Sequence, residues 1–146
     1  MEQRPTLIMM KGLPFSGKTE WATKWASEDP TRRIRLSWSD FLRSTGRANR
    51  YRHVVAFEGI CHMMLTALRL GMDVCIDEEN LDGVTWGVFV ARAQQEHAKV
   101  VWQTIRATPD ECKQRAVKYY VGGENCRRAC QDIDRKAELF GPWLEK

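Results

Sequence analysis

The sequence predicts an α/β fold in which a short, mostly parallel sheet of about four to five strands lies between layers of helices. Two observations predict it. Apolar, strand-like runs alternate with helical patterns along the chain, and a glycine-rich turn joins the first run to the first helix. Alternation of this kind is typical of parallel sheets, which place their ligands at the carboxyl ends of the strands.

The elements follow from hydrophobic periodicity. We expect strands at 6–10, 33–37, 73–77 and 100–105, and helices at 18–26 and near 53–70, 82–96, 109–119 and 125–139. The strand at 33–37 is the weakest of these because it carries two arginines. In the first helix, Trp21, Ala22, Trp25 and Ala26 share one stripe, which is typical of a face that packs on a sheet.

The first turn has the pattern of a phosphate-binding loop. Residues 12–19, GLPFSGKT, fit G-x-x-x-x-G-K-[ST] between the first strand and the first helix. Glycines let backbone N–H groups approach phosphates, and the helix N-terminus adds partial positive charge. This context predicts a P-loop NTPase-type three-layer sandwich, although a glycine turn before an amphipathic helix is the alternative. The predicted nucleotide contacts are Gly12, Pro14, Phe15, Ser16, Gly17, Lys18 and Thr19, with Lys18 on the β and γ phosphates and Thr19 on Mg²⁺.

Length and composition favour one domain over 1–146. The net charge of +4 permits an anionic partner without requiring one. Five cysteines without a C-x-x-C pair argue against a disulfide framework and against structural zinc. No apolar run approaches the roughly 20 residues needed to span a membrane, and the first residues lack an apolar signal core. These features are typical of a cytoplasmic protein without a membrane partner.

Polar residues follow the second and third predicted strands. Asp40 and Arg43 share a helical face if a helix starts near Ser39, so that Asp40 could accept the proton of an attacking hydroxyl and Arg43 could bind a phosphate. The third strand ends at Asp77, a candidate Mg²⁺ ligand, and Asn80 is close enough in sequence to contribute to the same site. The alternatives are a capping aspartate with an exposed arginine, and a turn whose side chains satisfy backbone groups.

Two further segments carry basic residues. Arg47, Arg50 and Arg52 are interleaved with rings such as Tyr51, a composition that suits single-stranded nucleic acid but also an ordinary solvated loop. Arg115 and Lys118 share a helical face before the glycine-bearing YVGGEN, which could close over a nucleotide as a lid. A plain helix-to-helix turn is the alternative for that segment.

Five segments together, LIMMKGLPFSGKTEWA, SDFLR, FEGI, CIDEENL and TPDECKQR, resemble the phage-type 5′-polynucleotide kinase domain and its zeta-toxin-like relatives among small P-loop kinases. The resemblance extends over about 7–139. It implies that ATP and Mg²⁺ bind at Lys18 and Thr19, that Asp40 is the general base, that Arg43 binds an acceptor phosphate, and that Arg115 belongs to a lid. The family's acidic residue after the third strand falls on Asp77 or on Glu78, and a later lid arginine falls on Tyr119, beside Lys118.

The interpretation we favour is a kinase that transfers the γ-phosphoryl group of ATP or another NTP to the 5′-hydroxyl of a nucleic acid. Its catalytic residues would be Lys18, Asp40, Arg43 and Arg115. Arg115 and Lys118 would also contact the nucleotide, and Thr19 and Asp77 would bind the metal. The acceptor would be bound by Asp40, Arg43, Arg47, Arg50 and Asn80. One alternative is a kinase of a small or base-linked hydroxyl, carried by a nucleotide, a nucleotide sugar or a hydroxymethylated base in DNA. The other is a nucleotide-binding module without catalysis.

Overall fold

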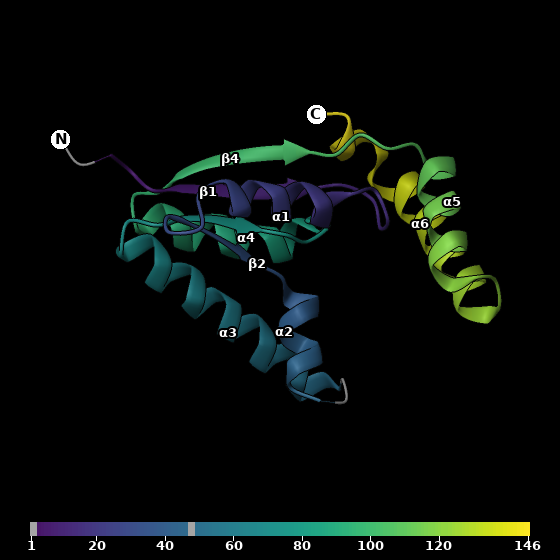
Figure 1. The fold of residues 1–146 in the computed structure, drawn as a ribbon, viewed down its shortest axis with the longest axis horizontal. Helices are drawn as coiled ribbons and strands as arrows, with labels where there is room; N and C mark the ends of the chain where they lie inside the picture. The colour runs from purple at the N-terminus through teal and green to yellow at the C-terminus, as the bar shows by residue number, and fades with distance from the viewer. Residues whose placement is uncertain (1–2, 47–48) are drawn as a thin grey trace.

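The computed structural model describes residues 3–46 and 49–146, which form an α/β structure (Figure 1). The sheet contains β1 (Thr6–Lys11), β2 (Arg33–Leu36), β3 (Asp73–Ile76) and β4 (Lys99–Thr104). Its order is β2-β3-β1-β4, and every neighbouring pair is parallel. The predicted fold class is therefore confirmed.

The helices are α1 (Lys18–Glu28), α2 (Trp38–Ser44), α3 (Arg50–Arg69), α4 (Gly83–Gln95), α5 (Pro109–Tyr120) and α6 (Glu124–Leu144). Two predicted helix boundaries differ from the structure by more than two residues. α3 starts before the expected residue 53 because the side chain of Asn49 accepts the N–H of Arg52 and caps the helix. α6 passes the expected end at 139, and its last turn is anchored where Trp143 Nε1 donates to the carbonyl of Asn80 at 2.9 Å.

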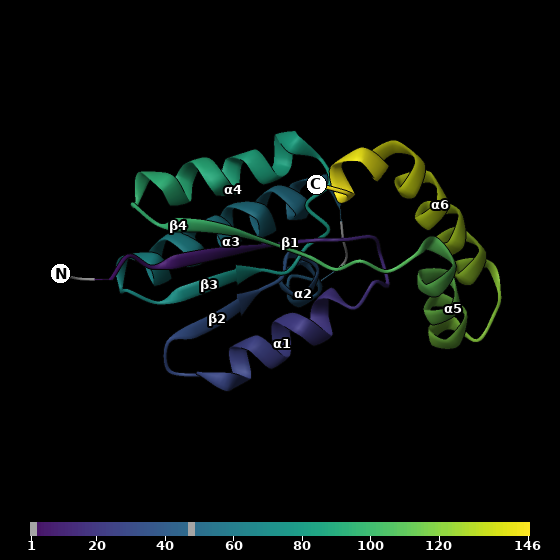
Figure 2. The ribbon, with the colours of Figure 1, turned by 90° about the horizontal axis from the view of Figure 1, so that it is seen from above.

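The sheet lies between two helical layers (Figure 2). Successive residues of β1 point to opposite faces, as strand geometry requires. Leu7 and Met9 pack in the core shared with α3 and α4, whereas Ile8 and Met10 pack with Ala22, Trp21 and Trp25 of α1. The predicted apolar stripe of α1 thus covers one face of the sheet.

The parallel register brings the carboxyl ends of the strands to one edge. Leu36 pairs with Ile76, and the N–H of Asp77 donates to the Leu36 carbonyl at 2.9 Å. The N–H of Gly12, after β1, donates to the carbonyl of Glu79 at 3.3 Å. The α5–α6 hairpin lies beyond this same edge (Figures 1 and 2). Polar residues that follow three different strands therefore lie together.

The five cysteines are free thiols in the structure. Cys112 and Cys130 pack where α5 meets α6, with Ala116 and Ile133. Across the part of the chain that the structure describes, no helix combines the length and the apolar character that crossing a bilayer requires.

Candidate active site

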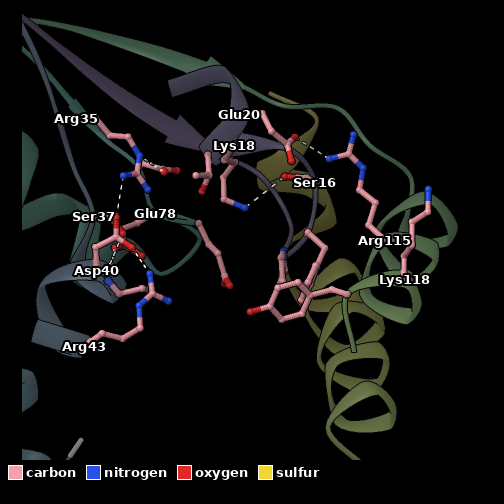
Figure 3. Close-up of a pocket in the computed structure, with 18 residues that line it drawn as sticks. Ser16, Lys18, Glu20, Arg35, Ser37, Asp40, Arg43, Glu78, Arg115 and Lys118 are labelled. Atoms are coloured by element: carbon pink, nitrogen blue, oxygen red, sulfur yellow. Dashed lines mark hydrogen bonds and ion pairs between the residues drawn. The ribbon is translucent and has the colours of Figure 1, made fainter. Parts of the chain in front are cut away.

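A cavity of about 710 Å³ opens at the carboxyl edge of the sheet. Figure 3 shows Arg35, Asp40 and Arg43 on one side of it, Arg115 and Lys118 on the other, and Lys18 between them. It is lined by Pro14, Phe15, Ser16, Gly17, Lys18, Thr19 and Glu20 from the first loop and α1; by Arg35, Ser37, Ser39, Asp40 and Arg43 from β2 and α2; by Asp77, Glu78 and Glu79 after β3; and by Arg115, Lys118 and Tyr119 from α5. The tertiary structure thus collects most of the predicted site residues.

The loop after β1 needs both of its glycines. Gly17 caps α1 with a φ of 106°, in the left-handed region that other residues rarely adopt. A Cβ on Gly12, which is outside the cavity lining, would approach Ser16 Oγ to 2.7 Å. The loop therefore forms a close backbone cradle at the N-terminus of α1, which fits a bound phosphate chain.

Lys18 is buried in this cradle, with 8% of its surface exposed. Its Nζ donates to the Leu13 carbonyl at 2.5 Å and to Ser16 Oγ at 3.3 Å, which are both neutral oxygens. Burial lowers the pKa of Lys18, although the charges of Glu79 and Asp77 act in the opposite direction. A buried ammonium bonded to neutral oxygens is suited to exchange them for an anionic ligand.

The oxygen ligands expected for Mg²⁺ lie in the same cavity. Thr19 is exposed at the start of α1, and the Asp77 side chain, 2% exposed, lies at the cavity wall. Among the described residues, no three His, Cys, Asp or Glu side chains converge as a metal-binding group. A hydroxyl and one carboxylate still fit Mg²⁺, because this ion commonly takes one or two protein ligands and completes its shell with water and phosphate.

Glu78 contacts the neighbouring helix. Its carboxylate accepts the backbone N–H groups of Trp38 and Ser39 in the first turn of α2. Burial raises the pKa of Glu78 to about 7, despite these two hydrogen bonds, which favour the carboxylate. Of the two acidic residues that the sequence offered for the metal, Glu78 is thus engaged with backbone groups of α2.

Asp40 and Arg43 lie in α2, which the side chain of Ser37 caps by accepting the N–H of Asp40 at 3.3 Å. Asp40 Oδ1 accepts from Arg43 Nη2, as expected of residues three apart on one helical face. Both side chains line the cavity. Their spacing of three residues was sufficient to predict that both lie on one helical face, whereas the bond between them is seen only in the structure.

Arg35 of β2 is a site residue that the sequence analysis missed. Its Nε donates to Asp77 Oδ2 and its Nη1 to Asp40 Oδ2, each at 2.8 Å. Burial lowers the pKa of Arg35, but the hydrogen bonds to Asp40 and Asp77 outweigh it and the net shift is upward. The available signal was the spacing of Arg33 and Arg35, which places both on one face of a strand.

On the opposite side of the cavity, Arg115 Nη1 contacts Glu20 Oε2 at 3.0 Å. Glu20 was also missed, because an acidic residue in a first helical turn is common and carries no specific signal. Phe15 packs against the rings of Tyr119 and Tyr120, with ring centroids 5.8 and 5.9 Å apart. Helix α5, which carries Arg115 and precedes the segment predicted as a lid, therefore contacts the glycine-rich loop.

Among the described residues, two of the predicted acceptor residues, Asn80 and Arg50, lie outside the cavity lining. Asn80 is buried outside its lining, where Nδ2 donates to the Met10 carbonyl at 2.6 Å and holds the turn after β3 against β1. Arg50 is exposed at the start of α3, 5.5 Å from the Tyr51 ring, and also lies outside the lining. Arg47 falls outside the described residues. Asp40 and Arg43 are the predicted acceptor residues that line the cavity within the described part of the chain.

Replacing Glu78 by glutamine should change how stability depends on pH. Folding raises the pKa of Glu78 from 4.5 to about 7, so the native state is destabilised when Glu78 is charged. The wild type therefore keeps its full stability below about pH 4.5 and loses part of it as the pH rises through 7. Glu78→Gln keeps an oxygen for both N–H groups without the charge. In urea unfolding without divalent cations, we expect its advantage over the wild type to grow between pH 5 and 8, up to about 3 kcal/mol. The exposed Glu138→Gln is the control, and a constant or reversed difference would contradict the interpretation.

Comparison with known proteins agrees with this architecture. A family model described as an AAA domain matches residues 7–127, while no sequence among the curated proteins matches the chain. The Pnkp1/Rnl/Hen1 RNA repair complex contains a similar chain, with a TM-score of 0.74, 17% identity, and coverage of 96% of this chain and 47% of that one. The chain thus spans about half the length of that similar chain.

Two further solved structures are similar. For a putative kinase from Chloroflexus aurantiacus, the TM-score is 0.68 and the identity 18%, covering 90% of this chain and 78% of that one. For the Mycobacterium tuberculosis APS kinase CysC in complex with AMPPNP and APS, the TM-score is 0.63 and the identity 12%, covering 82% of this chain and 73% of that one. At these identities the likeness concerns the fold alone. Because the family model spans most of the 146 residues, the protein belongs to the AAA domain family.

Proposed function

We propose that the protein is an ATP-dependent kinase that transfers the γ-phosphoryl group to a hydroxyl, with the 5′-hydroxyl of a nucleic acid as acceptor, like the phage-type polynucleotide kinases it resembles. One observation carries the proposal. The same cavity is lined by a phosphate-binding cradle with Lys18 and by a carboxylate–arginine pair, Asp40 and Arg43. A nucleotide-binding module without catalysis has no need of that second pair.

The cradle would hold the donor. Gly12 and Gly17 allow the loop's close approach, Lys18 would exchange the Leu13 carbonyl for phosphate oxygens, and Thr19 with Asp77 would hold Mg²⁺. When bound, ATP supplies the phosphoryl group and Mg²⁺ neutralises its charge. Arg115 and Lys118 lie across the cavity from Asp40, where their charges would stabilise negative charge that develops during transfer (Figure 3).

Asp40 would act on the acceptor. Its carboxylate takes the proton of the attacking hydroxyl while the new O–P bond forms and the bond from the γ-phosphorus to the bridging oxygen breaks, which releases ADP. Arg43 would bind a phosphate of the acceptor, because a guanidinium matches phosphate geometry. Side-chain exposure of 75% leaves Arg43 accessible to such a ligand.

Support for a polymeric acceptor comes from the start of α3. Tyr51 exposes 74% of its surface, and Arg50 lies beside its ring. Exposed rings next to arginines suit single-stranded nucleic acid, in which bases stack and phosphates are neutralised. A small acceptor is the second candidate, because Arg50 lies outside the cavity while Arg43 lines it.

The proposed function is tested by transfer from γ-labelled ATP to a panel of acceptors. The panel contains 5′-hydroxyl oligonucleotides of DNA and RNA, nucleosides, nucleotide sugars and DNA with hydroxymethylated bases. We expect labelled 5′ ends on oligonucleotides and much slower reaction of nucleosides. Faster labelling of a small or base-linked hydroxyl would favour the second candidate, and no transfer to any acceptor would reject the kinase proposal.

The salt dependence of acceptor binding separates the two candidates. Each phosphate that a basic side chain neutralises releases counterions, so the affinity for an oligonucleotide should fall steeply with salt. We expect Arg47→Ala with Arg50→Ala to flatten this slope by roughly one to two units, and Tyr51→Ala to cost about 1–3 kcal/mol in binding. Fluorescence anisotropy at several salt concentrations measures both effects.

The matched control for that double variant is Lys24→Ala with Arg32→Ala, which removes two exposed charges outside the cavity lining. It should leave the slope unchanged. Salt-insensitive acceptor kinetics, with no effect of the Arg47 and Arg50 changes, would mean that the acceptor is small.

A further inference from the structure

Arg35 joins two carboxylates that the proposed function assigns to different tasks. Its Nε contacts Oδ2 of Asp77, and its Nη1 contacts Oδ2 of Asp40, both at 2.8 Å. Asp77 follows β3 and is the assigned metal ligand, whereas Asp40 lies in α2 and is the assigned base. Arg35 therefore connects the residue assigned to the metal with the residue assigned to the acceptor, and Figure 3 shows it beside Asp40.

The two oxygens of Asp40 have different partners. Oδ2 is bonded to Arg35, whose side chain is 21% exposed, and Oδ1 is bonded to Arg43, whose side chain is 75% exposed. An exposed ion pair is weak and exchanges easily with water or a ligand. Arg35 is also held by Asp77, which is 2% exposed and would be left as a buried, unpaired charge if Arg35 moved away. Arg43 is thus the exchangeable partner and Arg35 the permanent one.

We propose that Arg35 is a positioning residue that holds Asp40 by Oδ2, so that Oδ1 becomes free for the acceptor hydroxyl when Arg43 turns to an acceptor phosphate. The inference rests on the proposed function and adds a residue to it. In this role Arg35 acts through Asp40 rather than directly on the donor or the acceptor. Because Arg35 also holds Asp77, the orientation of the base is coupled to the position of the metal-binding carboxylate.

Lysine cannot replace Arg35 in this role. A single ammonium can compensate the charge of Asp77, but it lacks the planar fork that reaches two carboxylates in fixed directions. Arg33 provides a matched control on the same strand. Its Nη1 donates to the Trp25 carbonyl at 2.9 Å, its guanidinium lies 5.0 Å from the Trp25 ring, and it is absent from the cavity lining.

The test compares Arg35→Lys, Arg35→Gln and Arg33→Lys for kcat, both KM values and the midpoint of thermal unfolding. We expect Arg35→Lys to unfold within a few degrees of the wild type while kcat falls roughly 10- to 100-fold and the KM for ATP is nearly unchanged, because a misplaced catalytic group costs rate. Arg35→Gln should lose both stability and rate, and Arg33→Lys should keep its rate. A wild-type kcat in Arg35→Lys would assign Arg35 a purely structural role and overturn the inference.

A double-mutant comparison tests whether Arg35 acts through Asp40. In the Asp40→Asn background, Arg35→Lys should lower kcat by less than about threefold, because residues that act as a unit are non-additive. An undiminished effect would overturn the inference. Absence of transfer by the wild type to every acceptor in the panel would instead overturn the proposed function together with this inference.

An NMR measurement reports on the contact without requiring activity. The side-chain N–H signals of Arg35 should persist in the wild type and in Arg43→Ala, and shift in Asp40→Asn. Signals that respond to Arg43→Ala as strongly as to Asp40→Asn would make Arg43, rather than Arg35, the permanent partner of Asp40 and would overturn the inference.

Discussion

Replacing Lys18 by alanine is expected to reduce phosphoryl transfer by at least about two orders of magnitude, because loss of a positioned charge at the developing negative charge costs roughly 2.7–4 kcal/mol. The fold should remain intact. Lys18 Nζ donates to the Leu13 carbonyl and to Ser16 Oγ, so its removal leaves no carboxylate without a hydrogen-bond partner. Burial also lowers the pKa of the amine, which means that the fold does not depend on its charge. Initial rates with γ-labelled ATP and thermal unfolding measure the two quantities.

Lys24→Ala is the control for this substitution, because Lys24 lies on the same helix and is exposed outside the cavity lining. Its rate should equal that of the wild type. If Lys18→Ala kept more than about a tenth of the activity, the role of Lys18 in holding the transferred phosphate would be wrong.

Asp40→Asn is expected to lower turnover by roughly two to four orders of magnitude while the affinity for ATP remains nearly unchanged, since asparagine has almost the same shape but cannot accept the proton. The helix should survive, because the Ser37 cap uses the backbone N–H of residue 40 rather than its side chain. Steady-state kinetics with calorimetric binding of ATP separates the two effects.

Asp110→Asn is a close control. Asp110 lies in the first turn of α5, pairs with Lys113 three residues later at 3.5 Å, and is 86% exposed outside the cavity lining. Asp110 and Lys113 have the same spacing as Asp40 and Arg43, but Asp110 lies outside the cavity lining. Substitution of Asp110 should therefore not change turnover. An equal loss of ATP affinity and of turnover in Asp40→Asn would indicate that Asp40 binds the metal.

Local spacing was sufficient wherever a feature depends on residues close in the chain. The predicted phosphate-binding loop spans residues 12–19, Asp40 and Arg43 lie within one helical turn, and the parallel strands follow from alternating apolar runs and helices. Helix ends were less predictable, because single hydrogen bonds such as that from the Arg52 N–H to Asn49, and packing such as that of Trp143, decide them.

The sequence by itself therefore determined the glycine-rich loop, the fold class and the helical face that Asp40 and Arg43 share. Only the tertiary structure decided that Arg35 meets Asp77, 42 residues away, that Glu20 meets Arg115, 95 residues away, and that Asn80 turns to the Met10 carbonyl. The physical reason is that the register of β2 with β3 and of β3 with β1, together with the packing of α5 against the loop, sets these distances. The types of side chain and their spacing along the chain do not directly specify that register.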